Sequence, residues 1–141
     1  MQLDYDRPDY ANVLRGADGA SALVNERTLL RSFVIAPDRL VEDWPVSAAS
    51  ALAPADLEPV LALRPEVVVL GTGARQVFPP ASVMAACLSR GIGIEVMANA
   101  AAARTFHVLA GEGRKVVAAL ILDESSFPRT RESTGSPPAR G

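Results

Sequence analysis

The chain has 141 residues, of which 49% are hydrophobic and only 5% aromatic, so we expect one domain with a core built mainly from aliphatic side chains. Its 16 acidic and 14 basic residues nearly balance, which argues against the strongly basic surface of a nucleic-acid-binding protein. The single cysteine, Cys87, excludes an intrachain disulfide. The sequence shows neither a signal peptide nor an apolar run of roughly 20 residues, so we expect a cytoplasmic protein without a membrane span.

The composition changes near both ends of the chain. We expect residues 1–10, which are acidic and polar, to form a loose leader. Residues 11–122 carry the apolar stretches and are predicted to form a single α/β domain. Residues 123–141 are rich in Ser, Pro, Arg and Gly and show no periodicity, so we expect a disordered tail.

Short apolar stretches separated by turn residues fill the first part of the domain, from Asn12 to Ala36. Asp18-Gly19 is a strong hairpin signal. We therefore predict two or three antiparallel strands, the last of them near Thr28–Ile35. Leu40–Pro45 alternates poorly between apolar and polar residues but is a further candidate for a short strand.

The second part alternates between apolar β runs and segments with helical periodicity. We predict, in chain order, a helix through Leu57 and Leu61, a buried strand at Val67–Leu70, a helix at Ala81–Arg90, a strand at Ile92–Met97, a helix from Ala100 to Gly111 capped by Asn99, and a buried strand at Lys115–Leu122. This order favours parallel strands with right-handed crossovers. The expected fold is therefore α/β, a single three-layer domain with a mixed β-sheet, an antiparallel N-terminal hairpin and a β-α-β-α-β second half.

The loop at Gly71–Gly73 is similar to the opening of a dinucleotide-binding motif. That motif requires a third glycine where this chain has Gln76, and its helix must open within the glycine run. Here the next helix opens only after Pro79-Pro80. We therefore expect the two glycines to allow a tight exit from the strand with positive φ. A ligand crevice at the carboxyl end of the strand stays possible, with Arg75 as a fixed charge.

Few side chains in the domain are placed for chemistry. Glu95 interrupts an otherwise apolar strand, so we expect either an ion pair with Arg75 or Arg104, or a role as a general base or ligand acceptor. His107 is the only histidine and is expected at the surface or an interface. Cys87 is expected to pack as a small hydrophobic residue. The spacing of these residues predicts no metal site and no cofactor.

Two stretches, LRPEVVVLGTGARQVFPP and GIGIEVMANAAAARTFHVLAGEGRKVVAALIL, carry a resemblance to a known family. Its most specific parts are the Gly71–Gly73 loop, Glu95–Met97, Ala103–Phe106 and Gly113-Arg114, and it spans about Val13–Leu122. In these positions the chain resembles a family of small, largely uncharacterised domains whose eukaryotic members include a mitochondrial assembly factor for respiratory complex I, the NADH:ubiquinone oxidoreductase. The resemblance implies a three-layer α/β fold around a mixed sheet, and it implies no known catalytic activity or cofactor.

The resemblance and the residues together predict a non-enzymatic binding or assembly protein. Its partners would be proteins of respiratory-complex or membrane-protein assembly, and not nucleic acid. The alternative is a small-molecule-binding protein or enzyme that uses a crevice at the Gly71–Gln76 loop and Glu95; an open, deep pocket there would favour it. Both hypotheses share one candidate binding face, which comprises Gly71, Thr72, Gly73, Arg75, Gln76, Glu95, Met97 and Arg104.

Overall fold

The computed structural model of the protein describes residues 12–123, so the expected leader and nearly all of the expected tail lie outside the described residues. The elements are, in chain order, β1 (Leu14–Ala17), β2 (Ala22–Val24), β3 (Arg27–Leu29), β4 (Phe33–Ala36), β5 (Arg39–Val41), the 3-10 helices η2 (Ala49–Ala51) and η3 (Pro54–Leu57), α1 (Glu58–Leu61), β6 (Val67–Gly71), α2 (Ala81–Leu88), β7 (Gly93–Met97), α3 (Asn99–Gly111) and β8 (Val116–Leu120). The β-α-β-α-β order expected of the second half is confirmed by β6 to β8.

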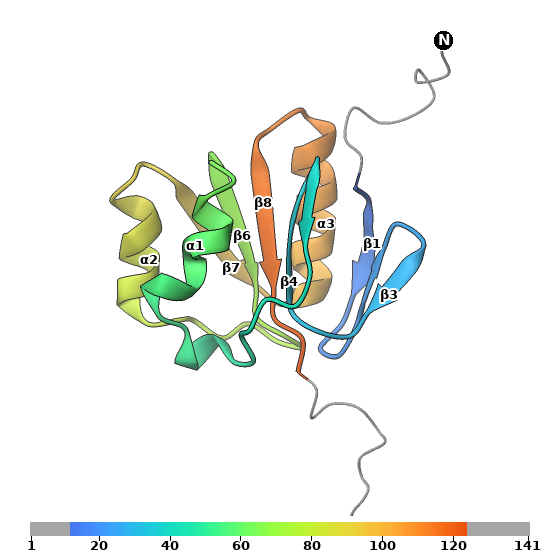
Figure 1. Cartoon of the computed structure of the whole chain (residues 1–141), viewed down its shortest axis with the longest axis horizontal. Helices are drawn as coiled ribbons and strands as arrows, with labels where there is room; N and C mark the ends of the chain where they lie inside the picture. Colours follow the sequence, from blue (N-terminus) through green and yellow to red (C-terminus); the bar gives the residue numbers. More distant parts are fainter. Residues whose placement is uncertain (1–11, 124–141) are drawn as a thin grey trace, which may run out of the picture.

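A mixed sheet of five strands lies at the centre, in the order β5-β4-β8-β6-β7 (Figure 1). Strand β6 runs parallel to both β7 and β8. Strand β4 runs antiparallel to both β5 and β8. The predicted mixed sheet is thus confirmed, and β8, the last strand of the described residues, occupies its middle. Strands β5 and β7 form its two edges.

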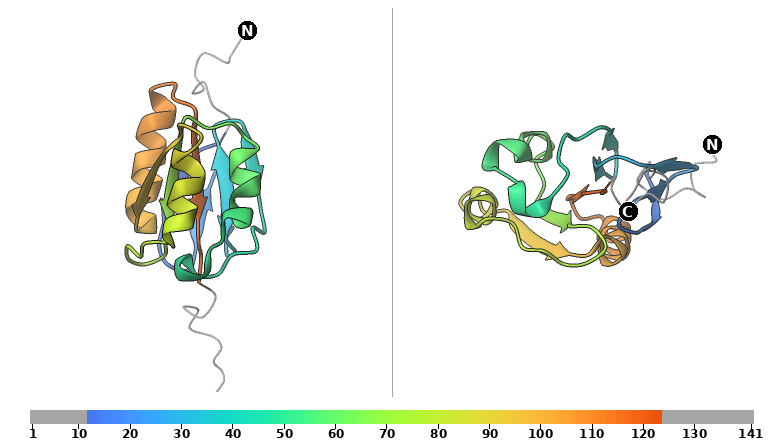
Figure 2. Two further views of the ribbon diagram at one scale, coloured as in Figure 1. Left: turned by 90° about the vertical axis from the view of Figure 1, so that its left-hand side faces the viewer. Right: turned by 90° about the horizontal axis from the view of Figure 1, so that it is seen from below.

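The sheet separates two apolar layers, because side chains alternate between its faces. On β6, Val67 and Val69 face a cluster that contains Phe106 of α3. Val68 and Leu70 face the opposite cluster, which contains residues of α1 and α2. Figure 2 shows α3 on one side of the sheet and α1 and α2 on the other. This is the expected three-layer arrangement, and all of β6 is buried within it.

A second, three-stranded antiparallel sheet, β1-β2-β3, packs beside α3. The single strand expected at Thr28–Ile35 is wrong, because the chain leaves β3 at Leu29 and enters β4, in the other sheet, at Phe33. Buried Ser32 fixes the crossing: its hydroxyl donates to the carbonyl of Val46 at 2.6 Å and accepts from the N–H of Leu122 at 2.9 Å. Because the buried hydroxyl both donates and accepts a hydrogen bond, it leaves no polar group unpaired where the chain passes between the two sheets.

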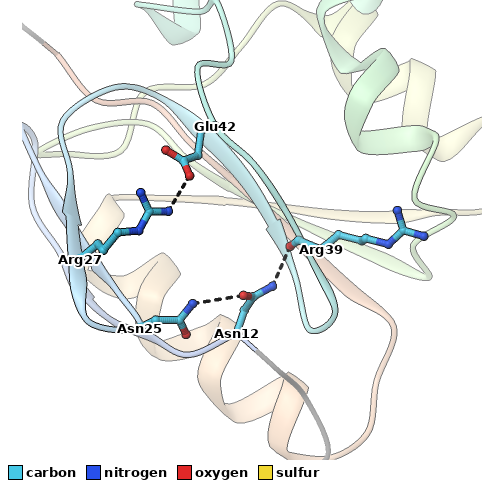
Figure 3. Close-up of polar contacts among 5 residues, drawn as sticks. All are labelled: Asn12, Asn25, Arg27, Arg39 and Glu42. Atoms are coloured by element: carbon cyan, nitrogen blue, oxygen red, sulfur yellow. Dashed lines mark hydrogen bonds and ion pairs between the residues drawn. The ribbon is translucent and has the colours of Figure 1, made fainter.

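Polar side chains tie the small sheet to the β4–β5 hairpin (Figure 3). The side-chain amide of Asn12 donates to the carbonyl of Arg39 at 2.9 Å, and Asn25 donates to the Asn12 side-chain oxygen at 3.3 Å. Arg27 of β3 forms an ion pair with Glu42, just after β5. The two sheets are therefore joined at their surface as well as through the core.

Candidate functional site

The loop that follows β6 directs most of its polar groups inward. The hydroxyl of Thr72 donates to the carbonyl of Arg75 at 2.7 Å and accepts from the N–H of Val77 at 3.0 Å. The side-chain amide of Gln76 donates to the carbonyl of Val96, on β7, at 2.8 Å. These groups hold the loop closed and bind it to the neighbouring strand. Arg75 and Gln76 are both exposed, but the Gln76 amide is bonded to β7, whereas Arg75 forms no ion pair with any described residue.

Asn99, at the first turn of α3, links this loop to two other segments. Its side chain is fully buried; the oxygen accepts from the N–H of Gly73 at 3.1 Å, and the nitrogen donates to the carbonyls of Asp18 and Ile121, each at 2.9 Å. The expectation that Asn99 caps α3 is wrong: Ala98 is the N-cap residue, and no side chain caps the helix there. The amide instead satisfies buried backbone groups from three separate parts of the chain.

The two glycines of the loop serve different purposes. Gly73 has φ of +115°, as expected for a tight strand exit. The same expectation is wrong for Gly71, which lies within β6 and owes its lack of a side chain to the close approach of α3. A Cβ at Gly71 would lie 2.4 Å from the side-chain oxygen of Asn99 and 2.9 Å from Leu120.

The predicted face is only partly brought together. Met97 pairs with Gly71 in the β6–β7 register, so Met97 lies beside the loop. Glu95 lies further back on the edge strand β7 and is exposed. Arg104 is exposed on α3. The expected ion pair is wrong, since within residues 12–123 Glu95 forms no salt bridge with Arg75 or Arg104.

Cavities of the described domain lie away from this loop. One of about 590 Å³ lies between β1 and α3, and another of about 500 Å³ lies near the start of β8. Neither of these cavities, nor either of two smaller ones in residues 12–123, is lined by the Gly71–Gln76 loop or by Glu95. Arg104 lines the first of them, away from the loop with which it was grouped.

The cysteine and the histidine lie in different layers. Cys87 is fully buried among apolar residues beneath α2, and this burial raises the pKa of its thiol. His107 is exposed on α3, across the sheet, so the two side chains form no dyad. Within residues 12–123 there is no group of three or more His, Cys, Asp or Glu side chains that could hold a metal ion. No helix of this part of the chain is long and apolar enough to span a membrane.

Sequence reasoning missed an exposed aromatic residue beside Arg75. Phe78 is 64% exposed in the segment that leads into α2, and Leu88 at the end of α2 is 59% exposed. A signal for this surface exists in the sequence, because residues 76–89 contain no Asp, Glu, Lys or Arg. The outer side of α2 is therefore uncharged, and Phe78 and Arg75 lie at one end of it.

The fold and this surface define a small three-layer α/β domain with an exposed Arg and Phe beside an uncharged helix and a glycine loop closed by internal hydrogen bonds. The chain belongs to the family described as protein of unknown function (DUF498/DUF598), whose model matches residues 15–121. This confirms the resemblance seen in the sequence.

Two curated proteins are similar to the chain. NADH dehydrogenase [ubiquinone] 1 alpha subcomplex assembly factor 3 from Danio rerio is 35% identical over 100 residues, which are 70% of this chain and 57% of that protein. The 13 kDa major membrane protein of Francisella tularensis is 32% identical over 65 residues, which are 46% of this chain and 53% of that protein. The chain thus spans little more than half the length of these curated relatives.

Solved bacterial structures share the fold. An NMR structure from Xanthomonas campestris is 52% identical, covers 94% of this chain and 100% of its own, and superposes with a TM-score of 0.78. A crystal structure from Bordetella parapertussis is 33% identical over 81% of this chain and 98% of its own, with a TM-score of 0.75. A Mth938-like domain from Bordetella pertussis is 28% identical over 92% of this chain and 100% of its own, with a TM-score of 0.72. The single α/β domain is therefore confirmed.

Proposed function

We propose that the protein is a non-enzymatic, cytoplasmic binding protein that captures a protein partner during the assembly of a respiratory or other membrane complex. The observation that carries this proposal is the closure of the Gly71–Gln76 loop by its own hydrogen bonds. Groups that would serve a small ligand are already satisfied there, whereas Arg75 and Phe78 remain exposed. The similarity to the Danio rerio assembly factor supports the assembly role.

The exposed surface has the chemistry of a protein interface. Aromatic residues and Arg are enriched in the centres of such interfaces, and charged residues are depleted there. Phe78 supplies the aromatic side chain and Arg75 the guanidinium, and the outer side of α2 carries no charge. We therefore place the partner over Arg75, Phe78 and the adjoining side of α2.

The alternative, a small-molecule-binding protein or enzyme at the same loop, has weaker support. It requires a cavity that encloses Glu95 beside Arg75. Glu95 is exposed on an edge strand, and the cavities between β1 and α3 and near the start of β8 are lined by other side chains. No observation on residues 12–123 favours this alternative over partner capture.

Affinity capture from gently solubilised cells of the source organism tests the proposal. The wild type, Arg75→Ala and Phe78→Ala would be compared by quantitative mass spectrometry. Arg39→Ala is the matched control, because it removes an equally exposed Arg on β5, at the opposite edge of the sheet. We expect subunits or insertion factors of a membrane complex with the wild type and the control, and their loss with both loop variants.

Two results of the capture experiment would contradict the assembly proposal. If the wild type captures no such protein, or if Arg75→Ala and Phe78→Ala retain it fully, the assembly proposal is wrong. A metabolite that stabilises the wild type and fails to stabilise Arg75→Ala would then establish the small-molecule alternative.

A further inference from the structure

A groove separate from the glycine loop runs between β1 and α3. Its volume is about 590 Å³, and it is open to solvent. Leu14 and Ala103, both almost fully buried, form part of its floor. Val108 lies on its rim and is 54% exposed, so it continues the apolar surface of the floor to the edge of the groove. The groove therefore offers an apolar surface of the kind that a ligand covers.

Every ionisable side chain that lines this groove is basic. They are Arg15 from β1 and Arg104 and His107 from α3, and no Asp or Glu lines it. Arg15 is held in position by its Nε, which donates to the carbonyl of Asn25 at 2.8 Å, and it forms a long contact of 3.7 Å with exposed Glu26. Arg104 forms no ion pair with any described residue. The groove therefore suits an acidic ligand.

Strand β1 borders the groove along its whole length, since Val13 to Ala17 all line it. Among the described residues β1 pairs only with β2, so its second edge has no partner strand (Figure 1). The register shifts between Leu14 and Gly16, which makes Arg15 the extra residue of a β-bulge. A bulge redirects a side chain, here that of Arg15. An extended peptide can add as a further strand to a strand edge that has no partner.

We propose that the groove between β1 and α3 binds an extended acidic peptide of a partner protein, which adds to the free edge of β1 while Arg15, Arg104 and His107 meet its carboxylates. Alternate side chains of such a strand point in opposite directions, so its apolar side chains would cover Leu14, Ala103 and Val108. This site is distinct from the Arg75–Phe78 surface and does not depend on the assembly role.

A peptide-binding experiment tests the site directly. The probe is a fluorescent peptide of about eight residues in which valine and glutamate alternate, with binding followed by anisotropy and by amide shifts of the isotope-labelled full chain. We expect shifts concentrated in residues 13–17 and 100–108, slower amide exchange in β1, and affinity that falls as salt rises. A peptide that alternates valine and lysine should not bind.

Two variants and one modified peptide identify the contacts. Arg104→Glu should weaken the glutamate peptide on the order of tenfold, because it replaces an attraction with a repulsion. Arg90→Glu, at the exposed end of α2, is the matched control and should change little. N-methylation of alternate peptide residues removes the backbone donors of one edge without altering charge, and it should abolish binding if the peptide adds as a strand.

Three results would overturn the proposal. Equal affinity for the glutamate and lysine peptides would remove the charge argument, and full binding of the N-methylated peptide would remove strand addition. Binding of laurate with no binding of the glutamate peptide would assign the groove to an anionic lipid. Self-association of the protein that Arg104→Glu abolishes would assign it to a second copy of the chain.

Discussion

Asn99 and Gly73 are joined by two hydrogen bonds of opposite direction. The backbone N–H of Asn99 donates to the carbonyl of Gly73 at 2.8 Å, and the N–H of Gly73 donates to the side-chain oxygen of Asn99 at 3.1 Å. This pair fixes the start of α3 against the end of β6. The loop expected to form a tight strand exit is therefore also part of the framework that positions α3.

Replacing Asn99 with alanine should destabilise the fold. The change leaves the N–H of Gly73 and the carbonyls of Asp18 and Ile121 without their partner, and unpaired buried groups are costly. We expect the free energy of unfolding in urea to fall by about 3 kcal/mol. Gln76→Ala, which removes one hydrogen bond from an exposed side chain, should cost about 0.5 kcal/mol. Equal losses for the two variants would contradict the role assigned to Asn99.

Replacing Gly71 with alanine should be nearly as damaging, for a steric reason. The new methyl group would lie 2.4 Å from Asn99 and 2.9 Å from Leu120, so α3 or β8 must shift. Overpacking of this kind costs about 2 kcal/mol. Gly93→Ala is the control, because the nearest atom to its new methyl group is 3.9 Å away. Thermal unfolding should show a clear loss for Gly71→Ala and almost none for Gly93→Ala.

The stability of the protein should decrease in acid, in part through Glu66. The backbone N–H of Lys115 and the side chain of Arg114 both donate to its carboxylate and lower its pKa. A lowered pKa in the folded state adds stability above the ordinary pKa, which is lost as the pH falls through the folded value. Urea unfolding from pH 6 down to about pH 3 should therefore show a shallower acid loss for Glu66→Gln than for the wild type. Glu58→Gln is the control, because exposed Glu58 contacts no described residue through a side-chain hydrogen bond or ion pair. If the free energy of unfolding falls with pH equally steeply in Glu66→Gln and the wild type, Glu66 does not contribute to the acid loss.

Glu95 should protect the edge of the sheet from unwanted pairing. It is the only charged residue of β7, it is exposed, and β7 has a free edge. A charge in the middle of an edge strand discourages another strand from adding to it. We expect Glu95→Val to raise the aggregated fraction in light scattering at elevated temperature, with little change in the free energy of unfolding. Glu58→Val tests whether any loss of surface charge does the same; aggregation of both variants to equal extent would argue against the edge explanation.

The sequence predicted the elements that are defined by local pattern. The apolar runs gave β6 and β8 to within two residues at each end, and α3 was placed between Ala100 and Gly111, one residue from its observed start. The family and the mixed sheet were also predicted correctly. Such features depend on the spacing of residues that are close together in the chain.

The errors concern residues whose partners are distant in the chain. Ser32 ends a strand because Leu122, 90 residues away, donates to its hydroxyl. The local pattern predicts a helix cap at Asn99, because its partners Asp18 and Ile121 lie 81 and 22 residues away. An ion pair was one of the two roles expected of Glu95, and no local pattern reveals that β7 is an edge strand. The candidate binding face itself stays a prediction that the capture experiment must test.

The position of β8 has a consequence for how the protein is made. Of the strands in residues 12–123, Val116–Leu120 is the last to leave the ribosome, yet it fills the gap between β4 and β6. Until then, two apolar strands that are wholly buried in the finished sheet have no neighbour on that side. The nascent chain must therefore complete synthesis of its domain before the central sheet can close, and during that interval it should be a client for chaperones that shield apolar segments.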